Sequence, residues 1–284
     1  LRQIETFLAV VASGSFHEAG RRLGLAQPTV SQHVRKLEEA LRATLVERGP
    51  LGCRPTAAAR AVIPYAESLL RVAGRAVEAV HRGRLAVGAS GNIGVYLLPG
   101  LVGRFEASAG GVPVDIAIAP NPVVAERLER AELDVALLEW WDWRAGFDAV
   151  AWREEPLVAI AAPGHPWARL GSVAVEDLAR EELLGGEPGS GTGRLLRETL
   201  GEAGRAGRHL GSTEAVKRAV RAGLGVSVVL AATVADEVAA GTLAAVPIAA
   251  ARPLRKRLWA VRRAHAPATA PERRFVEAIR GPEG

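Results

Sequence analysis

One stretch of the chain places polar side chains along a helix in a pattern that suits the major groove of DNA. Within LGLAQPTVSQHVRKLEEAL, a helix that begins near Gln27 tolerates Pro28, because first-turn N–H groups have no intrahelical partner. Glutamine and threonine side chains there can reach base edges, and proline can contact a thymine methyl group. Serine, arginine and lysine further along would hold phosphates, which sets position rather than sequence. The residues concerned are Gln27, Pro28, Thr29, Ser31, Gln32, Arg35 and Lys36.

Two preceding helices must position this one. Apolar residues at helical spacing predict a first helix that ends near Ser13, and Ser15 is a good N-cap for a short second helix that Gly24 closes. The third helix is expected to bury Val30, Val34, Leu37 and Leu41. Two short helices joined by a tight turn, with a polar second helix, form a helix-turn-helix. A solvated face on an ordinary helical subdomain is the alternative.

The next segment predicts a β-hairpin with two further arginines. ATLVERGPLGCRPT has the glycine and proline punctuation of a hairpin, and Arg48 and Arg54 flank its turn, as in a wing over the DNA backbone. Residues 1–84 contain 13 Lys and Arg against 7 Asp and Glu, whereas the remainder contains 23 against 24. A basic head on a near-neutral body favours binding to a polyanion, although an excess of surface arginine gives the same counts.

A long helix is predicted from Ala57 to Arg82. One apolar seam consists of Val62, Tyr65, Leu69, Val72, Ala76 and Ala79. An adjacent seam consists of Ile63, Ala66, Leu70, Ala73, Val77 and Val80. A helix this apolar on two sides needs a partner, most simply its own copy in a two-fold dimer that matches a two-fold operator. Burial in the core of its own chain is the alternative.

From Leu85 onward, strand-like and helical segments alternate, which predicts an α/β body of two lobes with a cleft. Two loops of this body resemble anion sites. The first consists of Ser90, Gly91 and Asn92, and the second of Gly189, Ser190, Gly191 and Thr192, with Arg194 one turn later. Helix N-termini present free N–H donors and a positive dipole end, and glycine admits a ligand close to the backbone. Ordinary helix capping would explain either loop by itself.

Enzyme motifs are absent. GGEPGSGTGR lacks the lysine of a phosphate-binding P-loop, and the first strand–helix turn lacks the dinucleotide fingerprint. Ser90 lacks the flanking glycines of a nucleophile elbow, because Asn92 stands at the second glycine position. The six histidines show no metal-ligand spacing and Cys53 is the only cysteine. We therefore expect no enzymatic activity, no metal and no cofactor.

A cytoplasmic location is the expectation from the same residues. A single cysteine allows no intrachain disulfide, which fits a reducing compartment. No apolar run approaches the roughly 18 residues of a membrane helix, and LRQIETFLAV lacks the basic region of a signal peptide. No membrane association is expected.

These motifs together resemble the LysR-type transcriptional regulators of bacteria. SFHEAGRRLGLAQPTVSQHVRKLEEALRATLVER is similar in order and spacing to the winged helix-turn-helix signature of that family. GASGNIGVYLLP, ELDVALLE, APGHPWA, EPGSGTGR and EAVKRAVRAGLGVSVV look like its two-lobed effector-binding domain, which is related to periplasmic binding proteins. The resemblance covers nearly the whole chain.

The resemblance implies an all-α winged helix-turn-helix head with a long linker helix, joined to a two-lobed α/β domain. The corresponding limits are 1–56 for the head, 57–83 for the linker and 84–284 for the effector domain, with lobe 1 at about 84–160 and 247–284 and lobe 2 at about 161–246. It also places Asn121 and Glu139 near the cleft. Trp140, Trp141 and Trp143 beside them fit a cleft wall and a packing or subunit interface equally well.

Some residues depart from the family pattern. Ala26 stands where serine is usual, which weakens the N-cap of the recognition helix. Gly20 replaces the second of two usual alanines, and in the wing Leu51 and Pro55 replace an arginine and a leucine. These departures bear on wing contacts and half-site affinity rather than on the fold.

The resulting functional expectation is a transcriptional regulator that binds double-stranded promoter DNA and responds to a small anionic metabolite bound between two lobes. By the same resemblance, homodimers would assemble into a homotetramer, and RNA polymerase would be a further partner. The alternative is a small-molecule binding protein whose basic head serves assembly only.

Overall fold

The structure is a computed structural model that describes residues 1–49, 52–108, 110–188, 190–250, 252–264 and 271–281. Within these ranges it leaves the side chains of residues 48, 75–82 and 203 undescribed. The chain divides into two compact units. The first comprises Leu1–Gly83 with Glu129–Glu132, and we call it the head; the second comprises the rest, and we call it the body.

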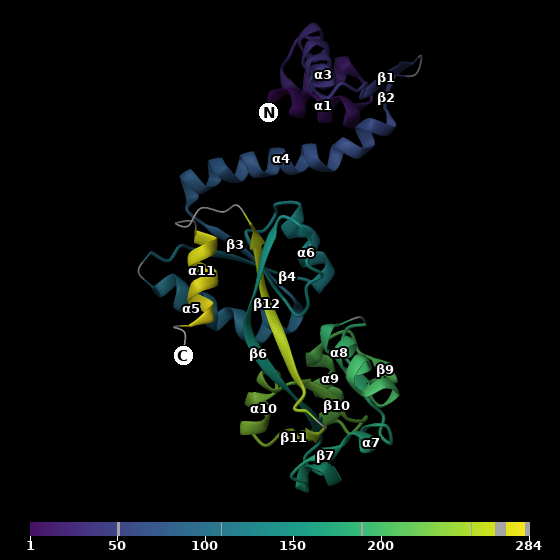
Figure 1. Ribbon diagram of the computed structural model, residues 1–284, viewed down its shortest axis with the longest axis vertical. Coiled ribbons are helices and arrows are strands. Elements are labelled where there is room, and N and C mark those ends of the chain that lie inside the picture. Colours follow the sequence, from purple (N-terminus) through teal and green to yellow (C-terminus); the bar gives the residue numbers. More distant parts are fainter. Residues whose placement is uncertain (50–51, 109, 189, 251, 265–270, 282–284) are drawn as a thin grey trace. The chain divides into compact units, whose positions relative to one another are not determined.

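The head contains the predicted helices in the predicted places (Figure 1). They are α1 (Arg2–Ser13), α2 (Phe16–Leu23), α3 (Gln27–Leu41) and α4 (Ala57–Arg82). Gly14 and Gly24 end α1 and α2 at φ 64° and 65°, left-handed conformations that favour glycine. The Ser15 hydroxyl accepts a hydrogen bond from the Glu18 amide at 3.3 Å, which confirms Ser15 as the N-cap of α2.

The three short helices pack around one small core. Its fully buried members include Phe7, Val10, Ala19, Val30 and Leu45. The prediction that Leu41 is buried is wrong, because α3 ends there and Arg42 turns the backbone into the left-handed region. A Cβ at Gly20 would lie 2.7 Å from the Leu25 carbonyl oxygen, so an alanine there would force this turn apart.

A buried contact joins α3 to the wing, which consists of β1 (Val46–Gly49) and antiparallel β2 (Gly52–Pro55). One carboxylate oxygen of Glu38 accepts hydrogen bonds from the amides of Leu45, at 2.7 Å, and Val46, at 3.1 Å. The Cys53 amide donates to the Gly14 carbonyl at 2.8 Å. The wing is therefore anchored at its base to both α3 and the end of α1.

The predicted long helix α4 is confirmed over its full length. The Thr56 hydroxyl caps it by accepting from the Ala59 amide at 3.0 Å. On one side Ala59 and Ala66 are buried, whereas on the other Tyr65, Leu69 and Val72 are 74%, 51% and 45% exposed. Ala76, Val77, Ala79 and Val80 of the predicted seams fall among the undescribed side chains. The described part of α4 thus presents a bare apolar stripe.

Lobe 1 of the body is a five-stranded mixed sheet in the order β4-β3-β5-β12-β6. Its strands are β3 (Leu85–Ala89), β4 (Val114–Ile118), β5 (Val135–Leu138), β6 (Phe147–Ala161) and β12 (Arg255–Arg263). Strand β3 is parallel to β4 and β5, but β12 is antiparallel to β5 and β6. Helices α5 (Leu98–Ala107) and α11 (Pro271–Arg280) lie on one face, and α6 (Asn121–Glu129) lies on the other (Figure 1).

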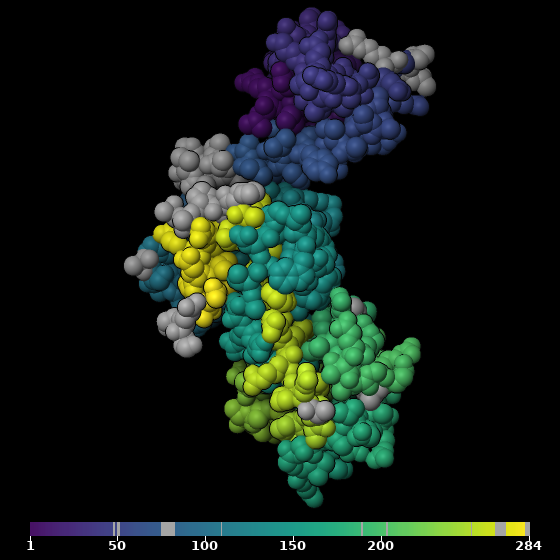
Figure 2. Space-filling model, in the orientation of Figure 1, coloured from purple at the N-terminus to yellow at the C-terminus, as the bar shows by residue number. Residues whose placement is uncertain are grey.

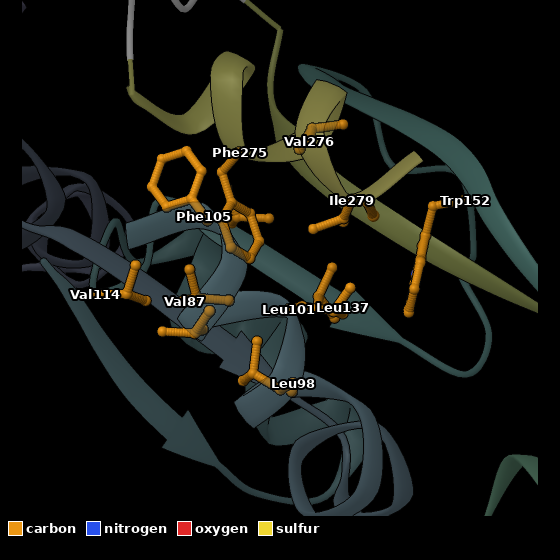
Figure 3. Packing of buried hydrophobic residues seen from close by; sticks show 14 of the residues in the cluster. Val87, Leu98, Leu101, Phe105, Val114, Leu137, Trp152, Phe275, Val276 and Ile279 are labelled. Atoms are coloured by element: carbon orange, nitrogen blue, oxygen red, sulfur yellow. The ribbon is translucent and has the colours of Figure 1, made fainter. Parts of the chain in front are cut away.

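Packing between α5 and α11 closes the larger core of lobe 1 (Figure 3). The rings of Phe105 and Phe275 meet edge to face at 5.1 Å, a favoured aromatic geometry. The helical segment before α5 starts at Gly91 and passes through a π-helical stretch, η1 (Ile93–Leu97). Such stretches are rare and concentrate at functional sites. This one faces lobe 2.

Lobe 2 is built around the far half of β6. Residues Phe147–Pro156 of β6 pair with β12, and Leu157–Ala161 pair with β10 (Ser227–Leu230) and β11 (Ala244–Ala249). One continuous strand therefore belongs to both lobes, which form separate masses in Figure 2. The other elements of lobe 2 are η2 (Pro166–Arg169), β7 (Val173–Ala174), α7 (Val175–Leu178), β8 (Leu184–Gly185), α8 (Gly191–Leu200), η3 (Gly201–Gly204), β9 (Arg208–His209), α9 (Thr213–Arg221), η4 (Ala231–Thr233) and α10 (Ala235–Ala239).

Among the described residues, no helix has the length and apolar character needed to cross a bilayer.

The Glu38 contact generates a test of how the wing is held. In Glu38→Ala the Leu45 and Val46 amides lose their acceptor, so we expect those two amides to exchange hydrogen at least tenfold faster, because an unsatisfied buried donor costs about 1–3 kcal/mol. Glu39→Ala is the control, since Glu39 forms an exposed pair with Arg35. Hydrogen exchange followed by NMR gives both rates; unchanged protection in Glu38→Ala would show that the wing is held by other contacts.

Candidate functional site

The outer surface of α3 presents the side chains that the sequence singles out. Gln27, Pro28, Gln32, Arg35 and Lys36 are exposed, and Thr29 and Ser31 are half-buried. Ala26 at the N-cap offers no side-chain hydrogen bond, as its residue type predicts. Arg35 lies against Glu39, with Nε 2.9 Å from the carboxylate. These residues form one polar surface that runs from the N-terminal turn of the second helix of the motif to past its middle.

A hydrogen bond that the sequence did not predict orients α3 on α1. The Thr6 hydroxyl is 2.9 Å from Nδ1 of His33, and it also donates to the Arg2 carbonyl at 2.7 Å. Because a hydroxyl has a single hydrogen to donate, Nδ1 of His33 must be the donor to Thr6. His33 thus supports the polar surface from behind.

The wing arginines are only partly described. Arg54 is exposed on β2, opposite Glu47 in the ladder. The backbone of Arg48 pairs with Cys53, but its side chain lies outside the described residues, as do residues 50 and 51 at the tip. Arg54 alone therefore carries the described positive charge of the predicted wing contact.

In the body, a cavity of about 430 Å³ lies between lobe 1 and lobe 2. The predicted residues that line it are Ser90, Gly91, Asn92, Asn121, Glu139, Ser190, Gly191 and Thr192. Gly189 lies outside the described residues. Arg194 does not line the cavity, because its Nε binds Glu198 at 2.7 Å and its guanidinium lies over the Trp140 ring. Arg197, further along the same helix, lines it instead.

Four helix N-termini meet at this cavity, two from each lobe. The helical residues begin at Gly91 and Asn121 in lobe 1 and at Gly191 and Thr213 in lobe 2. The caps of α8 and α9 are satisfied internally, since Ser190 and Ser212 accept from the amides of Gly193 and Ala215. Each N-terminus adds a partial positive charge of roughly half a unit. The cavity wall therefore favours an anion.

Ser90 differs from the other two caps. Ser90 is 2% exposed, and its hydroxyl oxygen has no hydrogen-bond partner in the described structure. A buried hydroxyl without a partner is costly, so its occurrence at the first turn of a helix facing a cavity indicates a place for a ligand.

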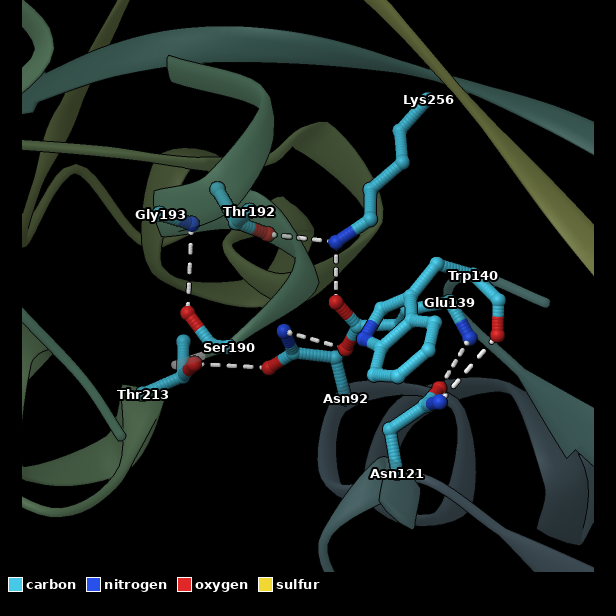
Figure 4. Close-up of polar contacts among 9 residues, drawn as sticks. All are labelled: Asn92, Asn121, Glu139, Trp140, Ser190, Thr192, Gly193, Thr213 and Lys256. Carbon is cyan, nitrogen blue, oxygen red and sulfur yellow. Dashed lines mark hydrogen bonds and ion pairs between the residues drawn. The ribbon is translucent and has the colours of Figure 1, made fainter. Parts of the chain in front are cut away.

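A buried ion pair lies beside the same cavity (Figure 4). Lys256 of β12 pairs with the Glu139 carboxylate at the end of β5, and it also donates to the Thr192 hydroxyl of α8 at 3.0 Å. Both charged side chains are about 5% exposed or less. Burial lowers the pKa of Lys256, against the opposing effect of the Glu139 carboxylate. Lobe 1, lobe 2 and a crossing strand thus meet at one ammonium group.

Amide side chains extend this network in both directions. Asn92 donates to the other oxygen of Glu139 at 3.1 Å and accepts from the Thr213 hydroxyl at 2.6 Å, which links the lobes a second time. The Asn121 side chain accepts from the Glu139 amide at 2.8 Å and donates to the Trp140 carbonyl at 3.1 Å. Asn121 therefore fixes the backbone that presents Glu139.

A further contact between the lobes lies at the mouth of the cavity. The Tyr96 hydroxyl of η1 donates to the Glu214 carboxylate of α9 at 2.7 Å. Buried Lys217 lies 2.6 Å from Glu214 and 2.7 Å from Glu237, and its ammonium faces the Tyr96 ring. Burial and the bond to Glu214 raise the pKa of Tyr96, which therefore stays protonated as the donor.

The tryptophans do not line the cavity. Trp141 is buried edge-on against Phe147, and Trp143 is 64% exposed beside Trp259. His165 does not line the cavity either; its ring accepts a hydrogen bond from the Trp167 amide at 3.2 Å and so caps the short helix η2. No cluster of potential metal ligands occurs among the described residues.

Comparison with known proteins decides the family. A family model described as the LysR substrate binding domain matches residues 78–281, and one described as bacterial regulatory helix-turn-helix protein, lysR family, matches residues 1–60. The chain belongs to the LysR family of transcriptional regulators. Members of this LysR family are regulators rather than enzymes, and the winged head and two-lobed α/β body confirm the expected fold class.

Individual relatives agree. This LysR-family chain is 48% identical over 190 residues to the putative HTH-type transcriptional regulator protein PtxE of Stutzerimonas stutzeri, covering 66% of this chain and 97% of that protein. It is 32% identical over 238 residues to the RuBisCO operon transcriptional regulator of Allochromatium vinosum, covering 81% and 78%. The crystal structure of full-length CbnR complexed with target DNA matches it with a TM-score of 0.57 at 26% identity over 98% of each chain.

Sequence patterns did not predict four of the side chains that hold the cleft of this LysR-family body together. They are Tyr96, Thr213, Glu214 and Lys256. Lys256 stands between two arginines in RPLRKRLW, which has the pattern of a solvated charge run. Its neighbours in space come from segments more than 60 residues away. Among these four, only Thr213 and Glu214 lie in a recognisable local pattern, STEA, which indicates the start of a helix.

The Tyr96–Glu214 contact generates a pH test. Hydrogen bonds from Lys217 and then Tyr96 lower the pKa of Glu214 below its ordinary 4.5. A carboxylate with a lowered pKa stabilises the folded state above its unfolded pKa, and that contribution disappears as pH falls through the folded pKa. We expect the free energy of unfolding of wild type to exceed that of Glu214→Gln by about 1 kcal/mol or less, since the Glu214 side chain is half exposed. The difference should be constant above about pH 5 and shrink at lower pH.

Urea unfolding between pH 3 and pH 8 measures this difference, with Glu198→Gln on the exposed surface of α8 as the control. A Glu214→Gln deficit that grows as pH falls would contradict the assignment.

Proposed function

We propose that this LysR-family regulator reads an operator with α3 and binds a small anionic metabolite in the cleft of its body. One observation carries the ligand proposal: the buried, unpartnered Ser90 hydroxyl at a cavity where four helix N-termini meet. The proposed effector contacts are Ser90, Gly91, Asn92, Asn121, Glu139, Gly189, Ser190, Gly191 and Thr192. Arg194, engaged with Glu198, is no longer among them.

The DNA contacts divide by chemistry. Gln27, Pro28, Thr29 and Gln32 supply base contacts from the first turns of α3, and exposure of the glutamines supports this assignment. Ser31, Arg35, Lys36, Arg48 and Arg54 contact phosphates. Arg35 would exchange its Glu39 partner for a phosphate. The similarity to CbnR, whose structure contains its target DNA, supports the same role for this head.

The domain limits and assembly follow the same scheme. Residues 1–56 bind DNA, 57–83 form the linker helix and 84–284 bind the effector, a division supported by the break between compact units after Gly83. The bare stripe on α4 pairs with its copy in a dimer, and two dimers form a tetramer that contacts RNA polymerase at the promoter. Ligand binding shifts the population of lobe arrangements and so alters the packing of effector domains and the DNA bend.

Dimerisation through α4 is testable with one residue. Leu69 is 51% exposed in the single chain, so Leu69→Glu should fold normally yet place a charge in the middle of the pairing surface. We expect the dimer dissociation constant to rise at least a hundredfold, because a buried unpaired charge costs several kcal/mol. Sedimentation equilibrium measures it, with Glu67→Gln on the same helix as the control. Equal association of both variants would leave α4 without a role in pairing.

DNA reading is tested with the intergenic DNA upstream of the regulator's own gene and a scrambled fragment, across a salt series. We expect a preference above about 10³ for the native fragment. Gln32→Ala should lose about 1–3 kcal/mol on native DNA only. Arg35→Ala should lower the affinity for both fragments equally and reduce the slope of log affinity against log salt concentration by about one. If wild type binds both fragments equally, the assay is repeated with a fragment selected by the protein from genomic DNA. Equal binding of the selected and scrambled fragments would favour a small-molecule binding protein whose head serves assembly.

A further inference from the structure

The buried Lys256 ammonium lies beside the effector cleft of the proposed function, behind the cavity-lining residues Glu139 and Thr192, and is neutralised by the chain itself. Its described partners are Glu139 from lobe 1 and Thr192 from the first turn of α8 in lobe 2. A lysine buried to this degree is stable as a cation only with an anion in contact. The group around it is therefore an anion site, and the Glu139 carboxylate is its occupant.

The position of Gly191 shows how closely this carboxylate approaches the helix. A Cβ on Gly191 would lie 2.8 Å from the Lys256 ammonium and 2.9 Å from a Glu139 carboxylate oxygen. The carboxylate thus lies at the first residue of α8, where an external anion would otherwise meet the N-terminal end of the helix dipole. Asn92 holds the second carboxylate oxygen in place.

We propose that Glu139 is an internal ligand: its carboxylate fills the anion site made by Lys256, Thr192 and the first turn of α8. This rests on the proposed function and deepens it. The anionic group of the effector then goes to the N-terminus beside Ser90, where the buried hydroxyl has no partner. A second negative charge at the first turn of α8 would meet the Glu139 carboxylate and be repelled by it.

The rest of the cavity fits an uncharged remainder of such a molecule. Its lobe 2 lining includes a buried apolar part, which consists of Leu184, Leu196, Val216, Val228 and Val229. A cavity of about 430 Å³ falls in the range of organic ligands. The cleft therefore combines the anion position beside Ser90 with a buried apolar part of its lobe 2 lining.

The proposal is tested by removing the internal ligand and supplying it from solution. Glu139→Gly vacates the volume of propionate, which is the glutamate side chain ended by a hydrogen. We expect the thermal midpoint of the full chain to fall by on the order of 10 °C, because Lys256 is left buried and unpaired. Propionate should restore most of this loss with saturation, whereas the uncharged isostere propionamide should not. Wild type should respond to neither.

The double variant Glu139→Gly with Lys256→Met is the control, because it has no cation to satisfy and should lose the propionate response. Equal responses to propionate and propionamide, or an undiminished response in the double variant, would overturn the proposal. If Glu139→Gly does not fold in chloride, the yield of folded protein is compared after refolding in propionate and in propionamide. Folded protein in propionate alone supports the internal ligand, and failure to fold in both overturns it.

These measurements contain no DNA, so their outcome is independent of the operator assay. Rescue by propionate without specific DNA binding would support the anion site and contradict operator reading by α3. Specific DNA binding without rescue would support operator reading and contradict the anion site.

Discussion

The contact between Lys256 and Glu139 constrains much of the body. A buried ammonium needs a carboxylate within reach, and here Lys256 lies on β12 and Glu139 directly follows β5, the neighbouring strand of the lobe 1 sheet. The pair also joins lobe 2, because α8 approaches closely enough for the Thr192 hydroxyl to accept a hydrogen bond from the Lys256 ammonium. That approach in turn requires glycine at 191, since a side chain there would displace either charge. The Lys256–Glu139 pair therefore constrains the distance between lobe 1 and α8, the size of residue 191 and the charge beside the cleft.

The crossing strands connect the two lobes beside this contact. Strand β6 is continuous through both sheets, and β12 runs antiparallel to it with a bulge at Leu258 and Trp259. Backbone hydrogen bonds hold these strands together on either side of the crossing, so the lobes can change their separation only by bending them. Among the described residues, side-chain hydrogen bonds of Asn92, Tyr96 and Lys256 link the lobes across the cleft, as do the ring contacts of Arg194 with Trp140 and of Lys217 with Tyr96.

The head was predictable because its information is local. Ser15, Gly24 and Pro28 act within their own helical turns, and the spacing of apolar residues determines which side is buried. Leu41 failed because burial at a helix end depends on where the chain turns next. In the body, the strand and loop order indicated a cleft and two loops after β3 and β8, six described residues of which line the cavity, whereas Asn121 and Glu139 came from the family resemblance. Lys256 could not be found this way, because its role arises from pairing between strands distant in sequence.

Arg194 and Lys256 show why a cation near an anion loop is a poor guide to the ligand. Arg194 follows the SGT turn of α8 at the spacing of an anion-binding residue, but on an exposed helix surface it meets Glu198 four residues later instead. Lys256 lies far from the turn in sequence, yet its strand delivers it into the dry junction, where a lost partner cannot be replaced by water. Burial, rather than proximity in sequence, makes a charge decisive for binding. The charge that this cleft presents to an effector therefore depends on whether Glu139 remains in contact with Lys256.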